Sequence, residues 1–177
     1  MRRKRLSHME KPTKKPTRML AVIMQRRTTS NRWQSVVWQP WAVLESDEPA
    51  GAPRCLVSQP DMEHWLHAGF ELLIHRDETE GYYLNVSSGS PRIFVLWRMD
   101  EGTSGGQDAA RGVPLQITAS YDEGGRWLDG GNSVDSVTMP PAIFAWVGAY
   151  VEANYRPEPK KRIKPRSFIH PKDRVER

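Results

Sequence analysis

The sequence contains only one cysteine, Cys55, among its 177 residues, so no disulfide bridge can form within the chain. A chain of this length can bury a core without disulfides or metals, and the lone cysteine agrees with a reducing compartment. Long apolar runs are also missing. The longest near the N-terminus covers residues 20–24, whereas a membrane-spanning helix needs roughly 20 apolar residues and a signal peptide also needs a longer run. We therefore expect a cytoplasmic protein that does not enter the membrane.

Lysine is absent from residues 19–155, which hold nine arginines against seventeen carboxylates and so carry a charge of −8. Residues 1–18 carry +7 and residues 156–177 carry +6, so the net charge of +5 comes from the two ends. Both ends are rich in proline, lysine and arginine and lack apolar periodicity, which predicts disorder. We expect basic disordered tails at 1–18 and 156–177 around one domain at 19–155. Met9 and Met19 are alternative starts to Met1.

Short β-rich runs separated by turn residues dominate the middle of the chain. The alternation is clearest at Phe70, Leu72 and Ile74, which share one face of a half-buried strand. The predicted strands cover residues 20–26, 33–44, 54–58, 63–75, 92–99, 114–120 and 133–138.

Two of these strands carry further information. Residues 92–99 are almost continuously apolar, which indicates a central strand. Pro40 interrupts the strand at 33–44, and proline donates no ladder hydrogen bond, so this strand should lie at an edge or contain a bulge. Residues 100–112, with four glycines, should form a mobile loop.

Apolar residues at helical spacing follow Pro140 and Pro141, which predicts a C-terminal helix ending near Asn154. A short helix is expected at 77–86, with Asp77 as its cap and Glu80 completing a capping box. A second short helix could cover residues 121–129. The fold class is therefore α+β: mainly an antiparallel sheet or a small barrel, with one or two short helices and a covering C-terminal helix.

Patterns that carry chemistry are scarce. His64, His67, His75 and Cys55 show no spacing that would place two metal ligands on one face, and strand alternation puts His64 and His67 on opposite faces. No glycine-rich phosphate loop and no nucleophile motif occurs. We expect no metal, no cofactor and no catalytic residue.

One polar run is denser than folding requires: residues 75–80 combine an imidazole, a guanidinium and three carboxylates at a strand-to-helix junction. Helix capping accounts for part of it, and the remainder favours a contact surface. Aromatic side chains are enriched at protein interfaces, and Trp41, next to Pro40, is expected to be exposed. The candidate interaction residues are His75, Arg76, Glu78, Glu80, Tyr82, Arg26, Arg27 and Trp41.

Several motifs together resemble a bacterial family of unknown function. They are Arg26-Arg27, Arg32-Trp33, Trp38, residues 42–44, the block at 73–82 and the exit at 155–159. Members of that family are commonly encoded beside formate dehydrogenase genes, and some carry the label molybdopterin-guanine dinucleotide biosynthesis protein A. The likeness spans roughly residues 20–162 and leaves most of both tails outside.

The resemblance implies a non-catalytic accessory protein that assists assembly or maturation of a molybdenum-dependent formate dehydrogenase through protein contact. One alternative is a molybdopterin nucleotide-binding enzyme or carrier, in which Arg26, Arg27 or Arg76 would contact phosphate. A nucleotidyltransferase of that kind would resemble a doubly wound fold with an N-terminal glycine-rich loop. The sequence indicates neither feature. Another alternative is nucleic-acid binding through the basic tails, which the negative middle of the chain opposes.

Overall fold

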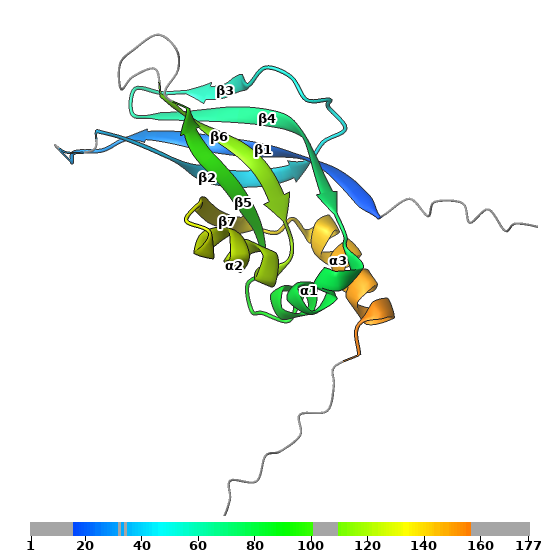
Figure 1. Cartoon of the computed structure of the whole chain (residues 1–177). Helices are drawn as coiled ribbons and strands as arrows, with labels where there is room; N and C mark the ends of the chain where they lie inside the picture. Colours follow the sequence, from blue (N-terminus) through cyan, green and yellow to red (C-terminus); the bar gives the residue numbers. More distant parts are fainter. Residues whose placement is uncertain (1–15, 32, 34, 101–109, 157–177) are drawn as a thin grey trace, which may run out of the picture.

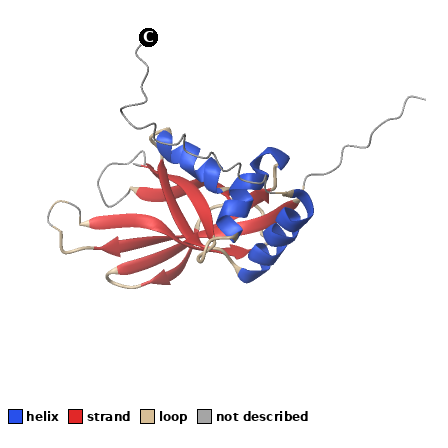
Figure 2. Cartoon of the chain, turned by 90° about the horizontal axis from the view of Figure 1, so that it is seen from below, coloured by secondary structure: helices blue, strands red, loops and turns tan. Residues whose placement is uncertain are grey.

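The computed structural model describes residues 16–31, 33, 35–100 and 110–156. These residues form two antiparallel sheets with the helices gathered toward one end (Figures 1 and 2). The α+β prediction is confirmed, but the small-barrel alternative is wrong because the two sheets stay open and separate. In the described part of the chain, no helix is long and apolar enough to cross a membrane. The elements are β1 (Thr17–Thr28), β2 (Val36–Glu45), β3 (Arg54–Ser58), β4 (Met62–Leu73), the 3-10 helix η1 (Arg76–Glu78), α1 (Thr79–Val86), β5 (Arg92–Asp100), β6 (Arg111–Thr118), α2 (Tyr121–Asp129), β7 (Ser133–Thr138) and α3 (Pro141–Asn154).

The first sheet has the strand order β2-β1-β4-β3. Its central strand β1 is buried from Leu20 to Gln25, because apolar side chains cover both faces of this strand. Leu20, Val22 and Met24 face the main core, whereas Ala21 and Ile23 form a smaller cluster on the opposite face.

Pro40 lies in β2, an edge strand of this sheet, as its missing N–H predicted. The register with β1 shifts beside it: Met24 faces Pro40 and Ile23 faces Ala42, so Trp41 is the extra residue of a β-bulge. Both readings of Pro40, edge and bulge, are therefore correct.

The second sheet has the order β6-β5-β7, with the apolar strand β5 in the centre as predicted. Pro114 again lies in an edge strand, β6, and Trp97 faces it while Leu96 faces Gln116. Leu115 is thus the extra residue of a second bulge.

The main core lies between the sheets and α3. Leu20 and Val22 from β1, Val95 from β5 and Val147 from α3 are all fully buried within it. A fully buried side chain of this kind contributes about 1.5–3 kcal/mol. Helix α3 begins at Pro141 and buries Ile143, Val147 and Val151, as the spacing predicted.

The boundaries of several elements differ from the expectation. Strand β1 begins at Thr17, because Thr17 pairs with Leu73 and the Arg18 guanidinium lies 5.5 Å from the ring centre of Trp146; the predicted tail at 1–18 is therefore wrong for its last two residues. Strand β2 begins at Val36 rather than at residue 33. Asp100 and Arg111 belong to β5 and β6, and residues 101–109 of the expected loop lie outside the described residues, as do 1–15 and 157–177.

Candidate functional site

The predicted contact surface begins at the junction between β4 and α1. The expected capping box is wrong: α1 begins at Thr79, its N-cap residue is Glu78, and no side chain caps it. Instead the Thr79 hydroxyl donates a hydrogen bond to the Arg76 carbonyl at 2.5 Å, which ties α1 to the preceding η1 turn.

The Glu78 carboxylate bonds to Arg126 of α2 and to Ser120, the residue just before α2. Ser120 Oγ donates to Glu78 Oε2 at 2.6 Å, and Arg126 Nη2 lies 2.5 Å from Glu78 Oε1. The bond to Glu78 raises the pKa of Arg126 above its ordinary value. Both carboxylate oxygens of Glu78 therefore hold two helices together, and Glu78 is a structural residue rather than a free contact residue.

Ser120 is itself the N-cap of α2. Its side chain is fully buried, and its Oγ accepts a hydrogen bond from the Glu123 N–H at 3.1 Å. The sequence carried a signal for this cap, a serine followed three residues later by glutamate. The apolar run before Ser120 instead favours a strand that ends at this residue.

Tyr82 packs in the core below the junction and stabilises it. It is fully buried, and its hydroxyl accepts a hydrogen bond from the His75 N–H at 3.0 Å. Burial raises the pKa of the Tyr82 hydroxyl to about 12. Tyr82 therefore offers no surface to a partner, whereas Arg76 and Glu80 are exposed and His75 is half-buried.

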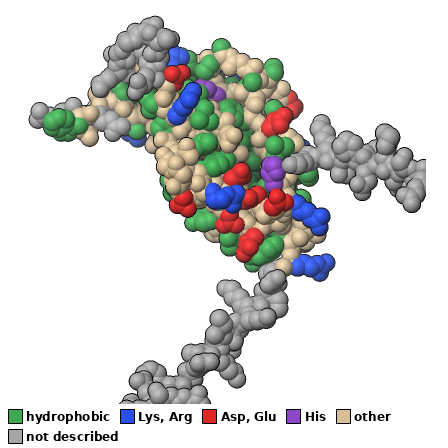
Figure 3. Space-filling view, viewed as in Figure 1, with side chains coloured by type: hydrophobic (Ala, Val, Ile, Leu, Met, Phe, Trp, Pro, Cys, Tyr) green, Lys and Arg blue, Asp and Glu red, His purple; other side chains and the backbone are tan. Residues whose placement is uncertain are grey.

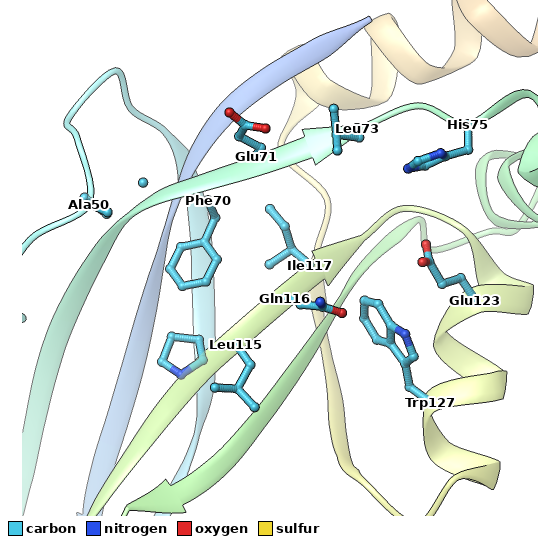
Figure 4. Close-up of a pocket in the computed structure, with 13 residues that line it drawn as sticks. Ala50, Phe70, Glu71, Leu73, His75, Leu115, Gln116, Ile117, Glu123 and Trp127 are labelled. Carbon is cyan, nitrogen blue, oxygen red and sulfur yellow. The ribbon is translucent and has the colours of Figure 1, made fainter. Parts of the chain in front are cut away.

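His75 stands at one end of a groove of about 580 Å³ that lies between β4, β6 and α2 (Figure 4). Phe70 projects into it from β4 and Leu115 from β6, while Glu123 and Trp127 extend from α2 toward β4 and His75 (Figure 4). The groove therefore combines apolar walls with polar groups at its rim.

The loop before β3 limits the other end of the groove. Gly69 has φ +87, and a Cβ added to it would lie 2.4 Å from the Ala50 backbone nitrogen. Only glycine suits this position, because it accepts both the left-handed conformation and the close approach of the loop.

The lining of the groove is acidic. Glu71 and Glu123 belong to it together with His75, and none of the lining residues is a lysine or an arginine. Acidic side chains gather in the same part of the surface, over α2 and the start of α1 (Figure 3). The groove is therefore suited to a ligand that carries positive charge.

Arg26, Arg27 and Trp41 do not join this site. Arg26 faces Glu63 near the start of β4, twelve positions before His75, so most of the length of β4 separates the two residues. Arg26 lies 3.8 Å from the Glu63 carboxylate, and Arg27 is exposed. Trp41 is 53% exposed, as predicted, and stacks on His64 with the two ring centres 5.2 Å apart.

His64 and His67 lie on opposite faces of the sheet, as the alternation predicted. His64 contacts the amide of Gln25 at 2.9 Å on the face that carries Trp41. On the other face, burial and the positive charge of Arg111 lower the pKa of His67 to about 4. Among the described residues, no three histidine, cysteine, aspartate or glutamate side chains form a group that could hold a metal ion.

Most of the groove has no signal in the sequence. Its walls come from three segments that are far apart in the sequence, and no local pattern links Phe70 with Leu115 or Trp127. His75 is the one predicted contact residue that lines it.

Comparisons with known proteins give one match. No curated protein and no solved structure matches the chain. A family model matches residues 19–164, and its description is protein of unknown function, DUF3305. This span contains the groove, the junction and every element from β2 to α3, and it nearly coincides with the span of the resemblance noted above. The chain therefore belongs to the DUF3305 family.

Proposed function

We propose that this protein is a non-catalytic accessory protein that binds a partner protein in the groove between β4, β6 and α2. The observation that carries the proposal is the combination of aromatic walls, Phe70 and Trp127, with an acidic rim in a groove of about 580 Å³. Buried aromatic side chains surrounded by polar groups are typical of the centre of protein interfaces. His75, Arg76 and Glu80 extend the contact surface at one end of the groove.

The first partner to test is a molybdenum-dependent formate dehydrogenase or one of its maturation factors. This choice is supported by the resemblance of the block at 73–82 and of the exit at 155–159 to a family encoded beside formate dehydrogenase genes. The proposed role is assistance with assembly or maturation of the enzyme, in the cytoplasm.

The groove favours a protein partner over a molybdopterin nucleotide. A nucleotide brings phosphate groups, which arginine and lysine side chains bind best, and the described lining contains neither. Of the arginines considered for phosphate, Arg26 already lies near Glu63 and Arg76 does not line the groove. Saturable binding of a guanine nucleotide in calorimetry would favour the carrier hypothesis instead.

The test is a calorimetric titration of the full-length chain with apo-formate dehydrogenase from the same organism. We expect a complex whose affinity falls at least tenfold in Trp127→Ala, because truncating an aromatic residue at an interface centre typically costs about 2 kcal/mol or more. The matched control is Trp33→Ala, since Trp33 is 84% exposed and does not line the groove. No complex, or equal losses in the two variants, would overturn the proposal.

A further inference from the structure

The walls of the groove are strand edges. Residues 68–71 of β4 and residues 114–117 of β6 line it, four consecutive positions in each strand. Among the described strands, residues 68–71 lie beyond the last pair of β4 with β3, and β6 pairs on one side alone, so each strand has an unpaired hydrogen-bonding edge beside the groove.

No described strand pairs with either edge. On the side opposite β1, β4 pairs with β3 only between Glu63 and Leu66, and β6 pairs with β5 alone. Unpaired edges present backbone N–H and C=O groups to which an extended segment can add as a strand.

Three features prevent the two edges from closing onto each other. Pro114 has no N–H to donate across the gap, and Leu115 forms a bulge in β6. The register between β1 and β4 also shifts between the pairs Leu20–Phe70 and Val22–His67, so that β4 contains a bulge at Ala68 and Gly69. The groove therefore stays open along both edges.

The two strands run in the same general direction on either side of the groove (Figures 1 and 4). A segment placed between them in the opposite direction would be antiparallel to both. Such a strand would join the two sheets into one continuous antiparallel sheet, in the order β2-β1-β4, the added strand, then β6-β5-β7.

The side chains around the groove indicate the composition of the added strand. Glu71 and Glu123 supply negative charge without a lysine or arginine in the lining, and Phe70, Leu115 and Trp127 supply apolar contacts. Strand alternation would let one set of side chains contact the apolar walls while the other set meets the carboxylates.

We propose that the groove binds an extended basic segment of the partner protein as an added β-strand between β4 and β6. This inference rests on the proposed function and specifies how the partner is held. The backbone edges select an extended segment of any sequence, and the carboxylates select for lysine and arginine within it.

The test uses full-length protein and a peptide of about ten alternating valine and lysine residues, which is long enough to span the groove at about 3.3 Å per residue. We expect saturable binding in calorimetry, with slower backbone hydrogen exchange in residues 68–73 and 111–118. A peptide of alternating valine and glutamate should not bind. The valine-lysine peptide with N-methyl groups on alternate residues should also fail to bind, because it keeps its charges but loses the N–H groups of one edge.

Glu71→Gln and Glu123→Gln should each weaken binding of the valine-lysine peptide about threefold, and the double variant about tenfold. The matched control is Glu152→Gln, an exposed carboxylate on α3 that does not line the groove. Equal binding of the N-methylated peptide, or unchanged affinity in the double variant, would overturn the inference.

The basic ends of this chain are the alternative occupants. The Pro16 carbonyl accepts a hydrogen bond from the Ile74 N–H, so Pro16 lies beside the end of β4, on the edge that pairs with β1. Glutamine at Lys11, Lys14 and Lys15 in the full chain should leave the peptide affinity unchanged. A tenfold tighter binding would show that the chain's own segment fills the groove, which contradicts the inference.

Different results would contradict the proposed function and the added strand. If the partner binds and Trp127→Ala weakens it, but neither the partner nor the peptide slows exchange at the two strand edges, the proposed function stands and the added strand does not. If neither ligand binds, both proposals fail.

Discussion

The Ser120 hydroxyl donates a hydrogen bond of 2.6 Å to the Glu78 carboxylate, and through this contact the start of α1 is fixed against the start of α2. The same oxygen accepts the Glu123 N–H and so caps α2. Glu123 and Trp127 of α2 line the groove, while His75 lies just before η1 and α1. Ser120 therefore helps to position Glu123 and Trp127 on α2 and His75 before α1, all of which line the groove.

Replacing Ser120 with alanine should destabilise the fold. Ser120→Ala removes a helix cap, worth about 1 kcal/mol, and a buried hydrogen bond to a charged group, worth about 1.5–3 kcal/mol. We expect a loss of about 2.5–4 kcal/mol in the free energy of unfolding, measured by urea denaturation. Ser133→Ala, at an exposed position, is the control and should change it by less than about 0.5 kcal/mol. Similar values for the two variants would contradict the role of Ser120.

Arg126 should matter less than Ser120, although it contacts the same carboxylate. Its side chain is largely exposed, and exposed ion pairs contribute about 1 kcal/mol or less. Arg126→Gln should therefore lower the free energy of unfolding by less than half the effect of Ser120→Ala in the same denaturation experiment. Raising the salt concentration should reduce the difference between Arg126→Gln and the wild type. A salt-independent loss as large as that of Ser120→Ala would contradict this account.

Gly81 is required by the close approach of the two helices. A Cβ at this position would lie 2.2 Å from Ser120 Oγ, a distance that forces either the hydroxyl or α1 to move. Gly81→Ala should destabilise the protein, although alanine is favoured over glycine by about 1 kcal/mol within a helix. The control is Gly148→Ala in α3, where an added Cβ meets nothing within 4 Å and alanine should stabilise. Thermal unfolding of both variants tests the opposite signs, and stabilisation by both would refute the crowding at Gly81.

His67 should make the fold sensitive to acid. Its pKa is about 4 in the folded chain and about 6.5 when unfolded, so the unfolded chain binds the proton first as the pH falls. The stability that neutral His67 contributes is complete above pH 6.5 and is lost progressively toward pH 4. Allowing for the partial exposure of the ring, the loss is about 1–2 kcal/mol. Urea denaturation should show this drop relative to His67→Gln, and parallel pH profiles would rule it out.

The regular elements could be predicted from local patterns. Alternation at Phe70, Leu72 and Ile74 indicated β4, and helical spacing at Ile143 and Val147 indicated α3, because one buried face sets the period of each element. These elements depend on residues that are close in the sequence, so a single sequence suffices to find them.

The groove could not be predicted in this way. It exists because the edges of β4 and β6 stay apart, and that separation depends on how two sheets pack rather than on a local pattern. The same limit explains why an open pair of sheets could not be distinguished from a barrel. Glu78 and Tyr82 resemble contact residues in the sequence, because the sequence does not show that Ser120 and the His75 backbone bond to them.

The central claim, that the partner binds in the groove, is tested most directly by site-specific photo-cross-linking. A photoreactive side chain would replace Leu115, which is 42% exposed in the groove, or Phe144, which is 43% exposed on α3 outside it. Irradiation with apo-formate dehydrogenase should give a cross-linked product from position 115 and none from position 144. Cross-links from position 144 alone, or equal yields from both positions, would contradict the account.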